Sequence, residues 1–111
     1  MDNRDGTILK KVLSECGVVQ DLLNGYSIAM FLSDERTKRA VCMTLINIGE
    51  LVKNLSPELT VAHRDIPWRN IAGMRDIAAH KYQTLKMEDV YTTAIEDIPQ
   101  LSDLIRGMIS E

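Results

Sequence analysis

The sequence predicts an all-α protein, an up-and-down bundle of four main helices plus a short one. Apolar residues recur at steps of three and four through most of the 111 residues, and no segment alternates apolar with polar residues for long enough to indicate a strand. With 45% hydrophobic and 26% charged residues, the composition is that of an ordinary globular protein. The length suits one domain, residues 1–111, that can bury a core unaided.

The first two helices are predicted from their apolar stripes. The first covers about residues 5–25, with the stripe Ile8, Val12, Cys16, Val19, Leu23 and Tyr26. The second should begin with Ser33 as N-cap, followed by the acidic residues Asp34 and Glu35, and run to about Leu55. Its stripe has a 4-3-4-3 spacing that suits antiparallel packing against the first helix: Val41, Leu45, Ile48, Val52 and Leu55.

A short helix and a longer one should follow. Ser56-Pro57-Glu58 indicates a fresh N-cap with proline at the first helical position, so a short helix is expected to about residue 62. Arg64-Asp65-Ile66 is a break, after which Pro67 can start the next helix, with His80 near its C-terminus. The residues of that helix expected to pack inward are Trp68, Ile71, Ala72 and Ala78.

The last predicted helix spans about Met87 to Met108. Its stripe is Val90, Ala94, Ile98, Leu101, Ile105 and Met108. Pro99 lies inside this stripe and removes one backbone donor. Because the apolar register continues beyond it, we expect Pro99 to kink the helix and not to end it.

Several functional classes are disfavoured by composition. No apolar run approaches the roughly 20 residues of a membrane helix, and the N-terminus lacks the basic and apolar regions of a signal peptide. A cytoplasmic protein is therefore expected, with no contact to a membrane. Cys16 and Cys42 show no metal-ligand spacing and are interpreted as buried thiols, so neither a metal nor a cofactor is expected.

Positive charge is concentrated in one region. The net charge is −3, yet residues 61–86 contain five basic residues against two acidic ones, a local balance of +3 that leaves −6 on the remainder. A site for a polyanion needs such a concentration, which chance can also produce in so short a window. The basic residues singled out as RNA-binding candidates are Arg69, Lys81 and Lys86.

The chemically richest stretch lies in this region: Arg75-Asp76-Ile77-Ala78-Ala79-His80-Lys81-Tyr82. An arginine suits a phosphate or a developing phosphorane, and a histidine can move protons near neutral pH. This combination indicates phosphodiester chemistry. On an ideal helix Arg75 and His80 are about 140° apart, so a helix end, a kink or a second chain must complete a working site. Asp76 shares a face with His80 and can favour the charged imidazole.

Taken singly, these residues also have ordinary explanations. His80 can cap a helix end, Arg75 can be a solvated surface arginine, and Tyr82 can be a packing residue with its hydroxyl in water. Asn47 and Glu50 are polar residues amid an apolar helix, and they either line the site or satisfy an internal polar contact.

The ordered set of motifs resembles the HEPN superfamily, and in particular the HepT-like toxins encoded beside a minimal nucleotidyltransferase. Ile48-Gly49-Glu50-Leu51 is similar to their second-helix signature. Ile66-Pro67-Trp68 followed by Ile71-Ala72-Gly73-Met74-Arg75-Asp76 is similar to the run that leads into their Arg-x4-His-x-Tyr motif, and the spacing to Ile98-Pro99 also fits. Lys81 departs from the small residue, often glycine, expected between the histidine and the tyrosine.

The resemblance implies an HEPN-like bundle and a role for each motif residue. Arg75 and His80 would be catalytic, Asp76 would support them, and Tyr82 would accept AMP from the partner enzyme. It also implies a homodimer whose two motifs face each other across a shared cleft.

Two functions are therefore expected as alternatives. The first is a metal-independent endoribonuclease toxin of a toxin–antitoxin system, which acts on RNA and is neutralised when a cognate nucleotidyltransferase modifies Tyr82. The second is a non-catalytic helical module that binds nucleotide or nucleic acid, or scaffolds the nucleotidyltransferase. The acidic total charge and the lack of an obvious aromatic platform favour the second. The intact set of Arg75, His80 and Tyr82 favours the first.

Overall fold

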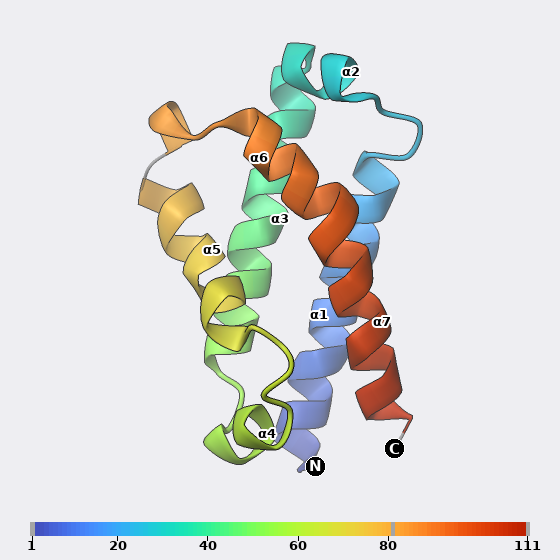
Figure 1. Ribbon diagram of the computed structural model, residues 1–111, viewed down its shortest axis with the longest axis vertical. Coiled ribbons are helices and arrows are strands. Elements are labelled where there is room, and N and C mark those ends of the chain that lie inside the picture. Colours follow the sequence, from blue (N-terminus) through green and yellow to red (C-terminus); the bar gives the residue numbers. More distant parts are fainter. Residues whose placement is uncertain (1, 81, 111) are drawn as a thin grey trace.

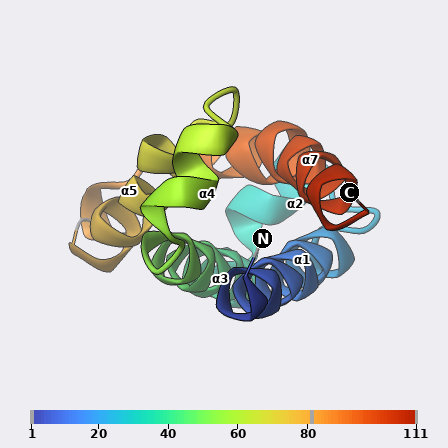
Figure 2. The ribbon, with the colours of Figure 1, turned by 90° about the horizontal axis from the view of Figure 1, so that it is seen from below.

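The computed structural model describes residues 2–80 and 82–110, without the side chains of residues 75–80. Within these residues every regular element is helical, which confirms the predicted all-α class (Figure 1). Long helices α1 (Asn3–Leu22) and α3 (Glu35–Lys53) pack against each other, and α7 (Ile98–Ile109) packs on the other side of α1. Helix α5 (Trp68–His80) lies along α3, so the order around the bundle is α5, α3, α1, α7 (Figure 2).

The core is built from the stripes that the sequence predicts. The fully enclosed side chains come from α1, α3 and α7, with one from the short helix that precedes α3: Leu9, Val12, Cys16, Val19, Phe31, Val41, Ile48, Ile98, Ser102 and Ile105. Cys16 and Cys42 are both buried with free thiols, as predicted. Burial raises the pKa of the Cys16 thiol to about 11, which keeps it protonated and unreactive at neutral pH.

A short helix, α2 (Ile28–Ser33), was missed by the sequence analysis and corrects the predicted start of the next helix. Ser33 is the last residue of α2 and not an N-cap. Asp34 takes that role in α3, because its carboxylate accepts a hydrogen bond from the Thr37 amide at 3.1 Å. Gly25, with φ of 77°, lies in the turn before α2, where an L side chain would be strained.

The predicted cap of the short helix is confirmed in α4 (Pro57–Ala62), where Ser56 Oγ accepts from the Leu59 amide at 3.2 Å. The Ser56 amide in turn donates to Asp5 Oδ1 at 2.9 Å, and the Ser56 hydroxyl donates to the other carboxyl oxygen. Asp5 is only 2% exposed. This buried contact ties the first turn of α1 to the start of α4, at the end of the bundle where both termini lie (Figure 1).

As predicted, Pro99 does not end the helix. The chain stays helical from α6 (Met87–Thr92) through η2 (Thr93–Asp97) into α7, but η2 is a π-helix. A proline cannot donate to the carbonyl four residues earlier and its ring crowds that carbonyl, so a wider turn before Pro99 relieves both problems. The disturbance therefore precedes Pro99, which itself lies in the first turn of α7.

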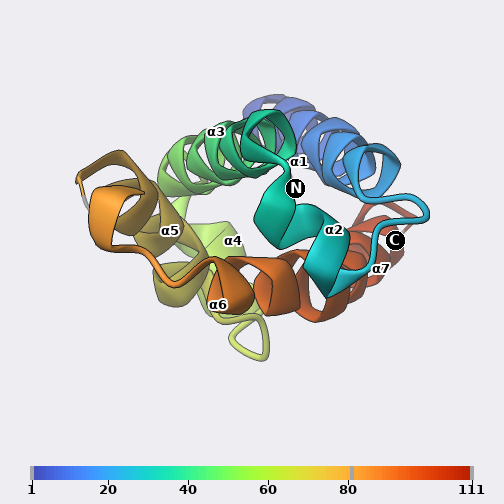
Figure 3. The same ribbon diagram turned by 90° about the horizontal axis from the view of Figure 1, so that it is seen from above.

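Helices α2 and α6 cover the end of the bundle opposite the termini (Figure 3). The Tyr91 hydroxyl donates to the Tyr26 carbonyl at 2.8 Å, and the rings of Phe31 and Tyr91 lie 5.5 Å apart between centroids. These contacts fix α6 against the connection between α1 and α2. Among the described residues, no helix combines the length and the apolar character needed to cross a membrane.

Candidate active site

Helix α5 carries the motif residues at its C-terminal end, and its N-terminal end is anchored in the core. Trp68 and Ile71 are buried in the core, and the Trp68 indole nitrogen donates to the His63 carbonyl at 3.0 Å. Trp68 is thus a core residue, as predicted. Ala72 is partly buried, as its predicted inward position requires, and Ala78 lies outside the described side chains.

The motif occupies the last turns of α5. The helix continues through Arg75 and Asp76 and ends at His80, which confirms the predicted position of His80 at the C-terminus. An unbroken helix separates positions 75 and 80 by about 140° around its axis. The side chains of Arg75, Asp76 and His80, and Lys81 altogether, lie outside the described residues, so their catalytic and RNA-binding roles stay predictions.

Tyr82 belongs to the short 3₁₀ helix η1 (Tyr82–Thr84), which follows α5. Because α5 ends at His80, it does not extend far enough to place Arg75 and Tyr82 on the same side of one helix. The phenol is partly buried, and its hydroxyl donates to Glu35 Oε2 at 2.7 Å. The ordinary explanation of Tyr82, a packing residue with its hydroxyl in water, is therefore wrong for the hydroxyl, which has a protein partner. The two residues are 47 positions apart, which is why sequence spacing gave no signal of their contact.

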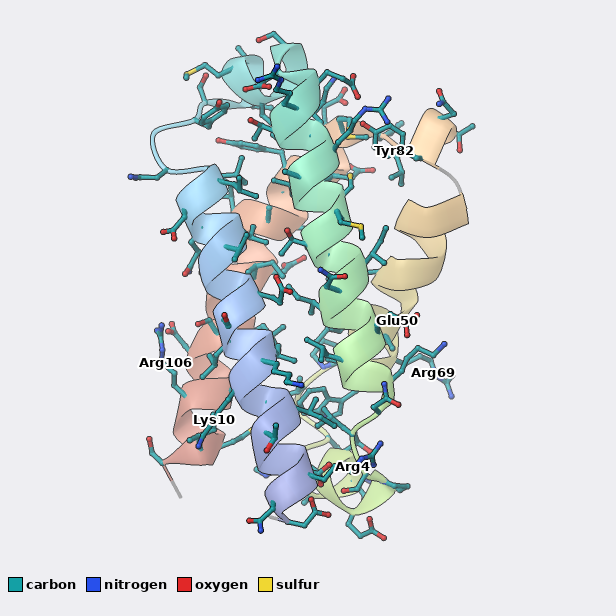
Figure 4. The ribbon with its side chains drawn as sticks, turned by 180° about the vertical axis from the view of Figure 1, so that it is seen from behind. Arg4, Lys10, Glu50, Arg69, Tyr82 and Arg106 are labelled. Atoms are coloured by element: carbon teal, nitrogen blue, oxygen red, sulfur yellow. The ribbon has the colours of Figure 1, made fainter. Side chains whose placement is uncertain are left out.

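Arg39, one turn after Glu35 on α3, completes the surroundings of the phenol. Its guanidinium carbon lies 4.9 Å from the centroid of the Tyr82 ring, and its Nε lies 2.8 Å from Glu35 Oε2. We call this group of Glu35, Arg39 and Tyr82 the phenol clamp (Figure 4, where Tyr82 is labelled). Lys38 also approaches the other oxygen of Glu35, at 3.4 Å.

The clamp shifts the pKa of both of its acidic groups. The hydrogen bond from Tyr82, followed by that from Lys38 and the positive charges of Lys38 and Arg39, lowers the pKa of the Glu35 carboxyl. Desolvation, followed by the hydrogen bond to Glu35, raises the pKa of Tyr82 to about 12. At neutral pH the carboxylate is therefore ionised and the phenol keeps its proton.

Of the basic candidates, Arg69 and Lys86 are both exposed but lie in different places. Lys86 precedes α6 and borders a hollow of about 250 Å³ whose wall also includes Cys42 and Met74. Arg69 is in the first turn of α5, roughly 17 Å along the helix axis from His80. Tyr82 and Arg69 are accordingly well separated in Figure 4. Lys38 and Arg39 were not predicted as part of the site, because only the fold brings them to Glu35 and Tyr82.

Two other hollows lie between helices, one of them beside the motif helix. An apolar groove of about 290 Å³ separates α5 from α7, and its walls include Ile71 and Met74 from one side and Leu101 and Leu104 from the other. Asn47 donates from its amide to Glu15 Oε1 of α1 at 3.3 Å. Asn47 therefore makes an interhelical polar contact, and with Glu50 it lines a hollow between α1 and α3.

A helical bundle that carries Arg-x4-His-x-Tyr across the end of one of its helices is the arrangement expected of the HEPN superfamily. A sequence model of the family described as "Ribonuclease HepT-like" matches residues 12–108. The chain therefore belongs to the HepT-like ribonuclease family.

Several proteins of this kind are similar over most of their length. "Putative RNase TTE0752" of Caldanaerobacter subterraneus subsp. tengcongensis is 33% identical over 93% of this chain and 92% of its own. "Putative RNase MJ0127" of Methanocaldococcus jannaschii is 28% identical over 93% of this chain and 88% of its own. "Probable ribonuclease HepT" of Thermococcus cleftensis is 41% identical over 64% of each chain. No solved structure gives a significant match.

Proposed function

We propose that this protein is a metal-independent endoribonuclease toxin, and that a partner nucleotidyltransferase neutralises it by transferring AMP to Tyr82. Membership of the HepT-like ribonuclease family supports the ribonuclease activity. The mechanism and the AMP transfer rest on one observation, the order of residues at the end of α5. Arg75 and His80 lie in its last turns, and Tyr82 follows in η1.

RNA supplies its own nucleophile, the 2′-hydroxyl, so the protein has three tasks. One group removes the proton of that hydroxyl, a second donates a proton to the leaving 5′-oxygen, and a cation stabilises the charge on the phosphorane between them. His80 suits the proton transfers and Arg75 suits the phosphorane. The products are a 2′,3′-cyclic phosphate and a 5′-hydroxyl.

One histidine cannot easily perform both proton transfers, and an unbroken α5 does not place positions 75 and 80 on one face. A homodimer that faces two copies of α5 across a shared cleft supplies two histidines and two arginines. We therefore place the proposed site at an interface between motif helices of two subunits.

The test is to incubate the purified protein with total RNA in EDTA, beside an Arg75→Ala/His80→Ala control. The parent should cleave, the control should not, and the product ends should be those named above. A strict magnesium requirement or a 5′-phosphate product contradicts the mechanism. No cleavage by a folded parent that is nevertheless modified by the nucleotidyltransferase supports the alternative of a non-catalytic partner module.

AMP on Tyr82 would bring negative charge and bulk to the end of α5, where an RNA phosphate has to bind, and would oppose RNA by repulsion and by occlusion. Tyr82→Phe keeps the ring and loses only the acceptor oxygen. Intact-mass spectrometry after co-expression with the adjacent-gene nucleotidyltransferase should show AMP units on the parent and none on this variant. The variant should still cleave RNA and should resist neutralisation.

A further inference from the structure

In the phenol clamp, the carboxylate of Glu35 is hydrogen-bonded to the Tyr82 oxygen, which is the oxygen that the proposed AMP transfer has to activate. The Tyr82 hydroxyl is 2.7 Å from Glu35 Oε2, a normal distance for a phenol that donates to a carboxylate. The side chain of Glu35 is 57% exposed, so a proton that it accepts can pass on to water.

A phenol that keeps its proton at neutral pH is a poor nucleophile and needs a base. The pKa of Tyr82 is raised to about 12, so the phenolate is scarce at neutral pH. The pKa of Glu35 is lowered, so the carboxylate is ionised and ready to accept. Complete transfer in the resting state is unfavourable, but the phenol becomes much more acidic as its oxygen bonds to phosphorus. The proton therefore moves to Glu35 during bond formation.

A purely structural role does not account well for this arrangement. Exposed ion pairs such as that of Arg39 with Glu35 contribute little to stability, because water screens them. What the clamp does fix is orientation, because Arg39 lies over the ring while Glu35 holds the hydroxyl. The phenol oxygen is thereby held at a defined place beside α3.

We propose that Glu35 is the proton acceptor for the modification of Tyr82, and that Arg39 positions the phenol ring for it. This inference rests on the proposed function, since it concerns how the AMP acceptor becomes reactive. It assigns to the toxin itself a step that would otherwise fall to the nucleotidyltransferase alone.

The step is balanced as follows. The Tyr82 oxygen forms a bond to the α-phosphorus of a nucleoside triphosphate, and the bond from that phosphorus to the oxygen bridging the α- and β-phosphates breaks. Pyrophosphate leaves, and the phenol proton passes to Glu35 and then to solvent. Afterwards Tyr82 can no longer donate to Glu35, and the nearby guanidinium of Arg39 can pair with the new phosphodiester anion.

The experiment measures the initial rate of AMP addition by intact-mass spectrometry, using full-length protein, ATP and the adjacent-gene nucleotidyltransferase. Glu35→Gln keeps the size and hydrogen-bonding capacity of the side chain but removes its basicity. We expect it to slow the modification about 10²-fold, nearly as much as Glu35→Ala. Glu58→Gln, an exposed residue of α4, is the matched control and should react at the parental rate. A structural role instead predicts a near-parental Glu35→Gln and a slow Glu35→Ala.

The pH profile gives an independent reading. For the Glu35→Gln variant the rate relative to the parent should rise with pH, because hydroxide then generates the phenolate that Glu35 no longer assists. Taking the ratio cancels titration of the nucleotidyltransferase, and the other charged or titratable groups around the clamp, Lys38, Arg39 and Cys42, are present in both proteins. If Glu35→Gln reacts at the parental rate, or if the ratio is independent of pH, the role of Glu35 is overturned while the proposed AMP transfer to Tyr82 still stands. If the parent acquires no AMP, the proposed modification itself is refuted, and this inference with it.

Discussion

The scaffold of α1, α3 and α7 and the motif arm of α5 and η1 differ in how they are packed. Among the described residues, the fully enclosed side chains come from α1, α3 and α7, apart from one in α2, and Ile48, Ile98 and Ile105 are typical of them. In the described part of α5 the most buried side chains are Ile71, at 5% exposed, and Trp68, at 9%. On its other side α5 faces α7 across an apolar groove.

The polar contacts also differ, because that of the scaffold is buried and that of the motif arm is exposed. The scaffold is fastened by the buried carboxyl group of Asp5 at one end. The motif arm is fastened beyond its helix by the exposed contact of Tyr82 with Glu35. The contrast indicates that stability resides mainly in the scaffold, while the arm holds the groups proposed to do chemistry. Changes in the two regions should therefore have separable effects.

The largest expected effect is on activity and concerns the arm. Neither Arg75→Ala nor His80→Ala alone should cleave RNA at more than about 10⁻² of the parental rate. When the parent is unfolded and refolded with an excess of the Arg75→Ala/His80→Ala double variant, most parental chains should pair with a variant chain and keep only one histidine and one arginine at the shared site. The RNA-cleaving activity per parental chain should then fall well below that of the parent refolded alone. A fully active monomer by light scattering, or an activity per parental chain that the variant does not lower, contradicts the shared site.

The next effect is on stability and compares one side chain from each region. Ile105→Ala leaves a cavity in the scaffold and should lower the free energy of unfolding by about 2–5 kcal/mol. Met74→Ala in the arm should cost about 1 kcal/mol, because Met74 is only partly buried and lines the groove. Urea denaturation measures both. Equal losses would mean that the arm is as tightly packed as the scaffold.

A smaller loss is expected from the buried contact at the terminal end. Asp5→Ala deprives the Ser56 amide and hydroxyl of their acceptor and should cost roughly 1.5–3 kcal/mol in the same denaturation experiment. Asp5→Asn keeps one acceptor oxygen and should lose less. If Asp5→Ala is neutral, the contact does not hold α4 to α1.

The helices and their stripes could be predicted because they depend on local periodicity. Ser56 was found as a cap because its partner amide is three residues away. The short helix α2 was missed because six residues are too few to show a period, and Asp34 was taken for a first-turn acid because Ser33 precedes it. The role of Glu35 was out of reach, since its contact with Tyr82 depends on how α5 and η1 fold back onto α3.

The smallest expected effect concerns pH and Asp34, the N-cap of α3. Its carboxylate accepts from the Tyr26 hydroxyl at 2.6 Å, and from the amide and hydroxyl of Thr37. The hydrogen bond from Tyr26, followed by those from Thr37, lowers the pKa of Asp34 from 3.8 to about 2. A depressed pKa in the folded protein means that Asp34 contributes its stabilisation above about pH 4 and loses it as the pH falls toward 2.

The measurement is the thermal midpoint of the parent and of Asp34→Asn across this pH range. The parent should be the more stable protein above about pH 4, and the difference between the two should shrink as the pH approaches 2. Other carboxyl groups titrate in both proteins, so their effects largely cancel in the difference. Tyr26→Phe removes the largest single cause of the shift and should weaken this pH dependence. A difference that stays constant with pH would show that Asp34 acts as a cap through its shape and not through its charge.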